Sequence, residues 1–202
     1  MENLSLKEFA AALSQKEAVP GGGGASACAG SYGCALGIMA CALTHGKKKY
    51  ACYEEDLSRI EGELAHCRDT LLNCINEDAK GFLPLSKAYG LPKDTPEQRL
   101  KKEKILEDAL YYASLTPMKV VKESARAMLL LDELSGKCSK LILSDVVTGA
   151  ALILASARGG FINVEANTGL MKNTELAQKL DVEASELLSQ TIQLHDRISQ
   201  MA

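Results

Sequence analysis

Apolar residues recur every three or four positions along most of the chain, which is the spacing of amphipathic helices. The longest such stripe predicts a helix over about 50–83 and consists of Leu57, Ile60, Leu64, Cys67, Leu71 and Cys74. The next position on this stripe is Asp78, and Phe82 follows it. A carboxylate therefore stands where the pattern calls for a buried apolar side chain.

Caps, prolines and glycines divide the rest of the chain into further helices. Thr95 with Pro96 starts one helix, and the same signal at Thr116 and Pro117 predicts that a new helix begins there. Ser144 is expected to cap a very apolar helix, which ends at a pair of glycines and is followed by an irregular segment. The predicted helices span about 5–17, 24–44, 50–83, 95–115, 116–134, 144–160 and 174–200. No segment alternates like a strand, so we predict an all-α, single-domain bundle of about seven helices over residues 1–202.

The predicted helix at 24–44 carries a small residue at every fourth position: Ala29, Gly33, Gly37 and Cys41. On a helix these positions form a groove that another backbone can approach closely. Each interior glycine costs about 1 kcal/mol relative to alanine, so we expect close packing to offset that cost. The helix that fills the groove belongs either to this chain or to a second subunit.

Composition narrows the class of protein. The 23 basic residues do not exceed the 26 acidic ones, which argues against nucleic-acid binding. The seven cysteines are odd in number and form no C-x-x-C pair, so we expect reduced thiols in a cytoplasmic protein. The three histidines show no metal-ligand spacing, and we expect no metal site. The first ten residues lack the apolar core of a signal peptide.

An uncharged stretch from Val19 to Gly46 is long enough to span a bilayer. It consists mostly of Ala, Gly, Ser and Cys, so its transfer into lipid is only weakly favourable. A buried central helix of a soluble protein fits this composition better, and no membrane association is expected.

Four glycines, Gly21 to Gly24, precede that helix, and three lysines, Lys47 to Lys49, follow it. The glycines do not complete G-x-G-x-x-G. They fit equally an anion site at a helix N-terminus and a tight turn between packed helices. The lysines either complement the helix dipole or attract a polyanionic ligand.

Asp78 is the sharpest candidate for chemistry. Burial raises the pKa of a carboxyl group, which suits it to exchange protons near neutral pH. The structural alternative is a buried aspartate that pairs with a cation or caps a neighbouring helix. Asp145 carries a weaker signal, because an acid directly after a cap such as Ser144 complements the helix dipole.

Several stretches together resemble the cyclodeaminase family, which includes the cyclodeaminase domain of formiminotransferase-cyclodeaminase and stand-alone bacterial methenyltetrahydrofolate cyclohydrolases. The resemblance covers nearly the whole chain. Its most specific part is "PGGGGASACAGSYGCALGIMACALTHGKKKY", and the weaker parts are "NEDAKGF", "LPKDTPEQR", "TPMKV", "LSDVVTGAAL" and "FINVEAN".

The resemblance implies an all-helical homodimer that acts on a tetrahydrofolate derivative and needs no other cofactor. The family's proposed catalytic carboxylate falls on Asp78. The matching positions that could bind substrate are Gly21, Gly22, Gly23, Gly24, Thr44, Lys47, Lys48, Asp145, Asn163 and Asn167. The lysines could attract the glutamate tail, and the asparagines could bind the pterin.

Three functions stay open on these residues. The first is formimidoyltetrahydrofolate cyclodeaminase, which forms 5,10-methenyltetrahydrofolate and ammonia. The second is methenyltetrahydrofolate cyclohydrolase, which forms 10-formyltetrahydrofolate. The third is a non-catalytic helical protein whose groove serves oligomerisation. The chain departs from the family pattern at Gly24, at His45 and in the segment "GKCSKLILS".

Overall fold

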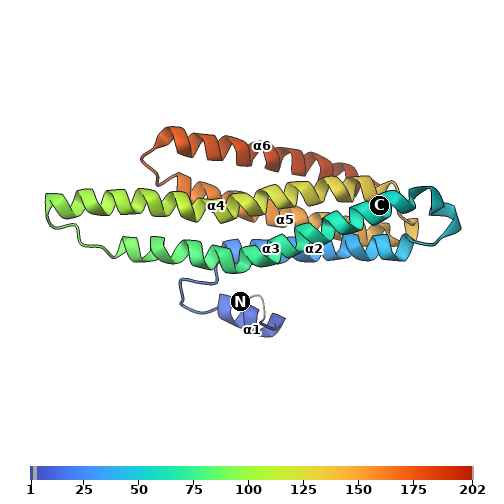
Figure 1. The fold of residues 1–202 in the computed structure, drawn as a ribbon, viewed down its shortest axis with the longest axis horizontal. Helices are drawn as coiled ribbons and strands as arrows, with labels where there is room; N and C mark the ends of the chain where they lie inside the picture. The colour runs from blue at the N-terminus through green and yellow to red at the C-terminus, as the bar shows by residue number, and fades with distance from the viewer. Residues whose placement is uncertain (2–3, 202) are drawn as a thin grey trace.

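The computed structural model describes residue 1 and residues 4–201. This part of the chain forms six α-helices, and two short 3₁₀-helices precede α3 and α5 (Figure 1). The elements are α1 (Leu6–Leu13), α2 (Gly22–Thr44), η1 (Lys48–Tyr53), α3 (Glu54–Tyr89), α4 (Pro96–Ser135), η2 (Lys140–Ile142), α5 (Leu143–Thr168) and α6 (Thr174–Ser199). No strand occurs within these residues, so the prediction of an all-α fold is confirmed.

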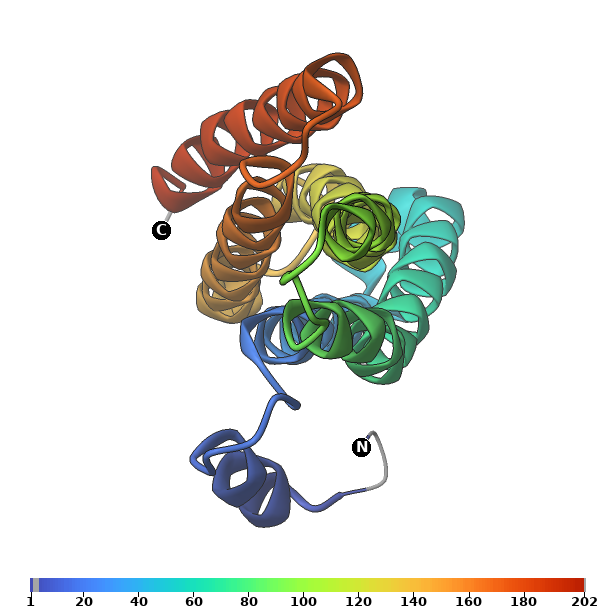
Figure 2. The same cartoon turned by 90° about the vertical axis from the view of Figure 1, so that its left-hand side faces the viewer.

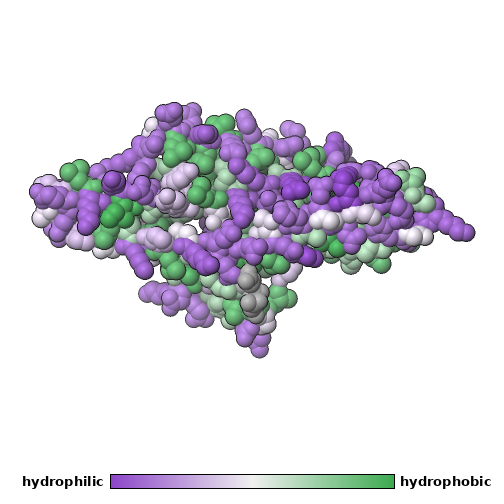
Figure 3. All heavy atoms as spheres, in the orientation of Figure 1, coloured by the Kyte–Doolittle hydropathy of each residue, from purple (hydrophilic) through white to green (hydrophobic). Residues whose placement is uncertain are grey.

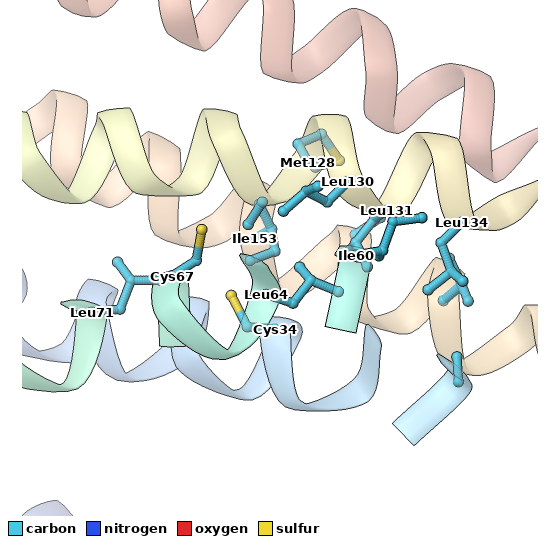
Figure 4. Close-up of a cluster of buried hydrophobic side chains, with 14 of the residues drawn as sticks. Cys34, Ile60, Leu64, Cys67, Leu71, Met128, Leu130, Leu131, Leu134 and Ile153 are labelled. Atoms are coloured by element: carbon cyan, nitrogen blue, oxygen red, sulfur yellow. The ribbon is translucent and has the colours of Figure 1, made fainter. Parts of the chain in front are cut away.

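Four long helices, α2 to α5, surround the main core, and the end-on view shows how they enclose it (Figure 2). Helix α6 packs on the outside against α4 and α5, whereas α1 lies at the side of the bundle, has no buried residue and packs the partly buried Phe9 against the core. The stripe predicted on α3 faces inward, since all six of its residues are fully buried. Figure 4 shows part of this core, where the thiols of Cys34 and Cys67 lie among aliphatic side chains.

The groove of small residues on α2 is filled by helices of the same chain. A Cβ atom at Gly33 would lie 2.7 Å from the carbonyl oxygen of Gly149 on α5. A Cβ atom at Gly37 would lie 2.6 Å from a methyl carbon of Leu131 on α4 and 2.7 Å from one of Leu64 on α3. These glycines therefore allow α2 to pack closely against three neighbouring helices, α3, α4 and α5.

The predicted helix boundary at Pro117 is wrong, because α4 runs without interruption from Pro96 to Ser135. A proline inside a helix leaves the carbonyl four residues earlier without its usual donor. Here that carbonyl belongs to Ala113, and the side-chain amide of Asn167 donates to it at 3.1 Å. Merging the two predicted helices accounts for six α-helices where about seven were expected.

The predicted limits of the apolar helix are also wrong. Helix α5 begins at Leu143, with Ile142 rather than Ser144 at the N-cap, and it continues through both glycines to Thr168. The glycines belong to a close helix contact, since a Cβ atom at Gly160 would lie 2.9 Å from Val121 Cγ2 on α4. The segment expected to be irregular is therefore helical.

Other boundaries agree more closely with the pattern. The capping boxes at Ser5 and Thr95 are both present, and α6 ends one residue before the expected position. Helix α1 ends at Leu13, earlier than predicted, and α3 continues beyond the predicted end through Pro84 to Tyr89.

Apolar residues are distributed unequally between the surface and the interior. The side shown in Figure 3 carries mainly hydrophilic side chains with scattered apolar ones. Two segments, Gly22–Thr44 and Lys140–Thr168, are long and apolar enough to cross a membrane by length and composition. Both contribute to the packed interior of the bundle, where α2 and α5 lie side by side. Core helices of soluble proteins meet the same criteria, so these two segments do not by themselves indicate a membrane protein.

Candidate active site

Asp78 lies on α3, one turn beyond Cys74 and directly beside the start of α2. Its Oδ2 atom accepts a hydrogen bond from the backbone N–H of Gly24 at 3.0 Å. This N–H is one of the donors that a helix leaves free at its N-terminus. Asp78 thus caps α2, which is the structural role that the sequence left open, and only one of its two oxygens is used in doing so.

The carboxyl group of Asp78 is half-buried, and this burial raises its pKa. The hydrogen bond from Gly24 lowers the pKa, but its effect is smaller than that of burial. No cation forms a salt bridge with Asp78 in the residues that the structure describes. The proton affinity of this carboxyl group is therefore set by desolvation and by the helix end.

The glycine turn makes this close approach of α2 and α3 possible. A Cβ atom at Gly23 would lie 2.5 Å from Cγ of Asp78, a distance at which the two atoms overlap. On the other side of the same turn, a Cβ atom at Gly22 would lie 3.3 Å from Nδ2 of Asn163 on α5. Asp78 and Asn163 therefore lie on opposite sides of the first turn of α2, each in close contact with its backbone.

A cavity of about 210 Å³ opens at this point between four helices. It is lined by Ala18, Val19, Gly21, Gly22, Gly23, Asp78, Phe82, Ala113, Pro117, Asn163, Ala166 and Asn167. Asp78 is the one ionisable side chain among these residues. The site can hold part of a small molecule and offers one carboxyl group that can accept and donate protons.

Two asparagines give the cavity its remaining polar side chains. Asn163 Nδ2 donates to the carbonyl oxygen of Gly159 at 2.7 Å, and Asn167 Nδ2 donates to that of Ala113 at 3.1 Å. A backbone carbonyl can only accept, so each amide nitrogen must face its carbonyl. The orientation of both amides is fixed by this chemistry.

The predicted site residues divide into two groups. The cavity brings together Gly21, Gly22, Gly23, Asp78, Asn163 and Asn167, and Gly24 lies behind Asp78 as its hydrogen-bond donor. At a rise of about 1.5 Å per residue, Thr44 lies about 30 Å from Gly24 along α2. Lys47 and Lys48 are exposed beyond Thr44, Lys47 in the turn that follows α2 and Lys48 at the start of η1.

Thr44 and Asp145 do not reach the cavity of their own chain. Thr44 is buried, donates to the carbonyl oxygen of Ala40 at 2.7 Å and accepts from the N–H of Ser139 at 3.4 Å. Asp145 lies in the first turn of α5, about 27 Å along that helix from Asn163.

The sequence analysis did not assign the apolar walls of the cavity. The helical period already placed Phe82 on the stripe one turn after Asp78, but nothing in the sequence marked it as part of a cavity. Pro117 and Ala113 come from α4, and the signal at Pro117 was interpreted as a helix start. Only the fold brings α4 to this cavity.

The described part of the chain offers few groups for metal or thiol chemistry. No cluster of three or more His, Cys, Asp or Glu residues there could hold a metal ion. All seven cysteines are free thiols, and five of them are buried. Burial raises the pKa of Cys41 and Cys67 to about 12, so both are neutral and pack as small apolar groups.

A helical bundle whose cavity presents one half-buried carboxyl group has the features of an enzyme that binds a small molecule. The chain belongs to the formiminotransferase-cyclodeaminase family, whose model matches residues 5–186. The methenyltetrahydrofolate cyclohydrolase of Methylorubrum extorquens is 31% identical over 97% of this chain and 94% of its own length.

Two further comparisons agree with this family. The formimidoyltransferase-cyclodeaminase of Mus musculus is 26% identical over 93% of this chain, which spans only 35% of that longer protein. The crystal structure of formiminotetrahydrofolate cyclodeaminase from Thermotoga maritima has a TM-score of 0.89 and 27% identity, and the match covers 99% of this chain and 96% of that one. The resemblance stated from the sequence is confirmed, and the family is one of folate one-carbon enzymes.

Proposed function

We propose that this chain is a formimidoyltetrahydrofolate cyclodeaminase with Asp78 as its catalytic acid and base. The observation that carries the proposal is the carboxyl group itself, which has a raised pKa, one free oxygen and a place in the wall of a cavity. The similarity to the Thermotoga maritima structure, which bears the cyclodeaminase name, supports the choice of reaction.

The reaction needs one group that can both take and give a proton. N10 of 5-formimidoyltetrahydrofolate adds to the formimino carbon, and a bond forms between them while the carbon–nitrogen double bond becomes single. Asp78 accepts the N10 proton and passes it to the exocyclic nitrogen. A further proton from solvent makes that nitrogen leave as ammonia, and the cationic methenyl bridge remains. A carboxyl group with a raised pKa serves both transfers.

A second candidate is methenyltetrahydrofolate cyclohydrolase, and the relative of that name at 31% identity favours it. Water adds to the methenyl carbon while Asp78 removes one of its protons. The bond from carbon to N5 then breaks, N5 gains a proton, and 10-formyltetrahydrofolate forms with net release of one proton. Both reactions place the same demand on Asp78, and neither calls for a cofactor besides the folate.

We further propose that the enzyme is a cytoplasmic homodimer. The outer side of α2 bears no charge and exposes Tyr32, Met39 and Leu43 by 41%, 36% and 50%. A second copy packed there with its α2 antiparallel would bring its own Lys47 and Lys48 towards the cavity of the first. In that arrangement the lysines of one subunit could bind the anionic glutamate tail of a substrate held in the cavity of the other. Within a single chain they lie too far from the cavity to do so.

The deciding experiment supplies purified protein with each substrate in turn and follows the absorbance of the methenyl group. A rise with 5-formimidoyltetrahydrofolate supports the cyclodeaminase, and a fall with 5,10-methenyltetrahydrofolate, above the spontaneous rate, supports the cyclohydrolase. The absence of both, with folded protein, would leave the non-catalytic oligomerisation role. Sedimentation velocity of the same sample tests the dimer.

A further inference from the structure

Pro117, in the wall of the cavity, changes the hydrogen bonding of another wall residue, Ala113. It lies in the middle of α4 and has no N–H to give to the carbonyl of Ala113. That carbonyl belongs to a buried residue and would lack its helical hydrogen bond. The amide of Asn167, which comes from α5, donates to it instead at 3.1 Å.

The two helices are close enough for this exchange because α5 has a glycine at the contact. A Cβ atom at Gly160 would lie 3.1 Å from the carbonyl oxygen of Pro117 and 3.3 Å from Cγ1 of Val120. Any larger residue there would push α5 away from α4. The reach of Asn167 to Ala113 thus depends on both Pro117 and Gly160.

The consequence for the cavity is the direction of one oxygen atom. Because Asn167 Nδ2 faces the carbonyl of Ala113, its Oδ1 faces away from that carbonyl, and no hydrogen bond engages it within the described residues. Among the described residues, the side-chain atom fully sealed from solvent without a partner is Glu123 Oε2, so the unpartnered Asn167 Oδ1 keeps some contact with solvent. Asn163, one turn earlier, presents its own Oδ1 in the same way.

We propose that Pro117 is a positioning residue, which holds Asn167 so that its oxygen, with that of Asn163, accepts hydrogen bonds from the amino and ring N–H groups of a reduced pteridine. This inference rests on the proposed function, because the substrate class comes from it. A 2-amino-4-oxopyrimidine ring presents neighbouring N–H donors along one edge, and two acceptors one helical turn apart are suited to bind such an edge. Asp78, across the first turn of α2, then remains free for the one-carbon unit.

The first test replaces Pro117 with alanine. Pro117→Ala restores a backbone N–H, which competes for the Ala113 carbonyl and releases Asn167. Alanine suits a helix better than proline, so the protein should fold. We expect KM for the substrate that the wild type converts to rise about fivefold or more, with kcat within about twofold. The matched control is Pro84→Ala, since Pro84 is also inside a helix but is exposed and does not line the cavity.

The second test asks whether Pro117 acts through Asn167. Asn167→Leu should raise KM at least as much as Pro117→Ala, and adding Pro117→Ala to it should raise KM no further. Inhibition by tetrahydrofolate and by its 2-desamino analogue gives a separate measure of recognition. The wild type should prefer the amino compound, because the desamino analogue leaves the Asn167 oxygen without a hydrogen-bond donor. Both variants lack a correctly placed oxygen, so they should lose most of that preference.

The outcomes separate this inference from the function beneath it. If Asp78→Asn abolishes turnover while Pro117→Ala and Asn167→Leu keep normal KM and normal preference for the amino group, the positioning role is wrong and the proposed function stands. Equal effects of Pro117→Ala and Pro84→Ala would also overturn it. A wild type that neither converts nor binds any reduced folate would end both.

Discussion

At its first turn, α2 meets a carboxyl group inside a cavity, and at its last turn it meets an exposed cluster of charges. Asp78 has a single backbone donor, whereas His45 lies between two carboxylates, with Nδ1 2.6 Å from Glu54 and Nε2 3.2 Å from Glu61. Burial raises the pKa of Asp78, and the hydrogen bond to Glu54 is the main cause of the raised pKa of His45. One end thus sets the affinity for a proton mainly by partial burial, and the other sets it by ion pairs at the surface.

The difference teaches which end is suited to catalysis. A desolvated carboxyl group gains or loses its proton at a cost set by the cavity, so a bound substrate can alter that balance directly. The exposed cluster is screened by salt, and its ion pairs contribute little individually. This contrast favours the cavity for the proposed proton transfer, and it leaves the basic end, with Lys47 to Lys49, for the proposed attraction of an anionic ligand.

The largest effect is expected for Asp78→Asn. The amide oxygen of asparagine can still accept from Gly24, so α2 keeps its cap, but the side chain no longer exchanges a proton. We expect kcat to fall about 10²–10⁴-fold with a nearly unchanged melting temperature. The control is Asp69→Asn, which removes an exposed carboxylate of the same helix outside the cavity and should keep near-normal kcat. Near-normal turnover of Asp78→Asn itself would end the proton-transfer role.

The next effect concerns the position of the carboxyl group rather than its chemistry. Gly23→Ala adds a Cβ atom that overlaps the Asp78 side chain and must displace it. We expect kcat to fall about tenfold or more, since small misplacements are costly in catalysis, and the free energy of unfolding to drop by about 1–3 kcal/mol. Gly62→Ala is the matched control, because nothing lies within 4 Å of its new Cβ. It should keep full activity, and a Gly23→Ala enzyme of equal activity contradicts the need for this glycine.

The same contrast explains how much the sequence could predict. Asp78 was found because it interrupts a stripe of one helix, which is a local pattern with a fixed period. The glycine turn was found because four glycines in a row have few structural explanations. Both signals are readable within a few residues, and both belong to the cavity.

Tertiary contacts set the features that were missed. Thr116 and Pro117 look the same at a helix start and inside a helix whose freed carbonyl is satisfied from elsewhere, and that donor, Asn167, lies on another helix. Gly160 resembles a helix end for the same reason, since the sequence does not show that Val121 packs against it. Lys47 and Asp78 are far apart because α2 is long. This separation bears on the assignment of the site only when the position of the cavity is known.

A smaller effect is expected at the basic end. Changing Lys47, Lys48 and Lys49 together to alanine should weaken binding of a polyglutamylated folate about threefold to tenfold and that of the monoglutamate less, because exposed ion pairs are individually weak. Competition binding at low and high salt measures this difference. In contrast with Asp78→Asn, kcat at saturating substrate should be unchanged. Equal losses for both ligands would return the lysines to the simpler role of complementing the end of α2.

The smallest effect is in stability as a function of pH, and both ends change it in the same direction. For Asp78, whose pKa in the folded protein lies above the ordinary value of 3.8, the folded state holds the proton more tightly than the unfolded state. Ionisation is therefore penalised by folding, and stability falls as pH rises from about 4 through the raised pKa. For His45, whose pKa is raised above 6.5, the stabilisation is fully present below that pH and is lost as pH rises through the folded value.

Variants and salt should separate these two contributions. Asp78→Asn should remove the decline in stability that begins in the acidic range. His45→Gln should remove the decline at higher pH, and because its ion pairs are exposed, the change in melting temperature should be about 1–2 °C. High salt should shrink the His45 contribution, since Glu54 and Glu61 remain accessible to counterions, and should reduce the Asp78 contribution less, because the half-buried Asp78 forms no ion pair among the described residues. Thermal melts of the wild type and both variants, between pH 4 and 9 at two salt concentrations, make the measurement. If salt reduced both contributions alike, Asp78 would be as solvated as His45, and the contrast between the two ends of α2 would disappear.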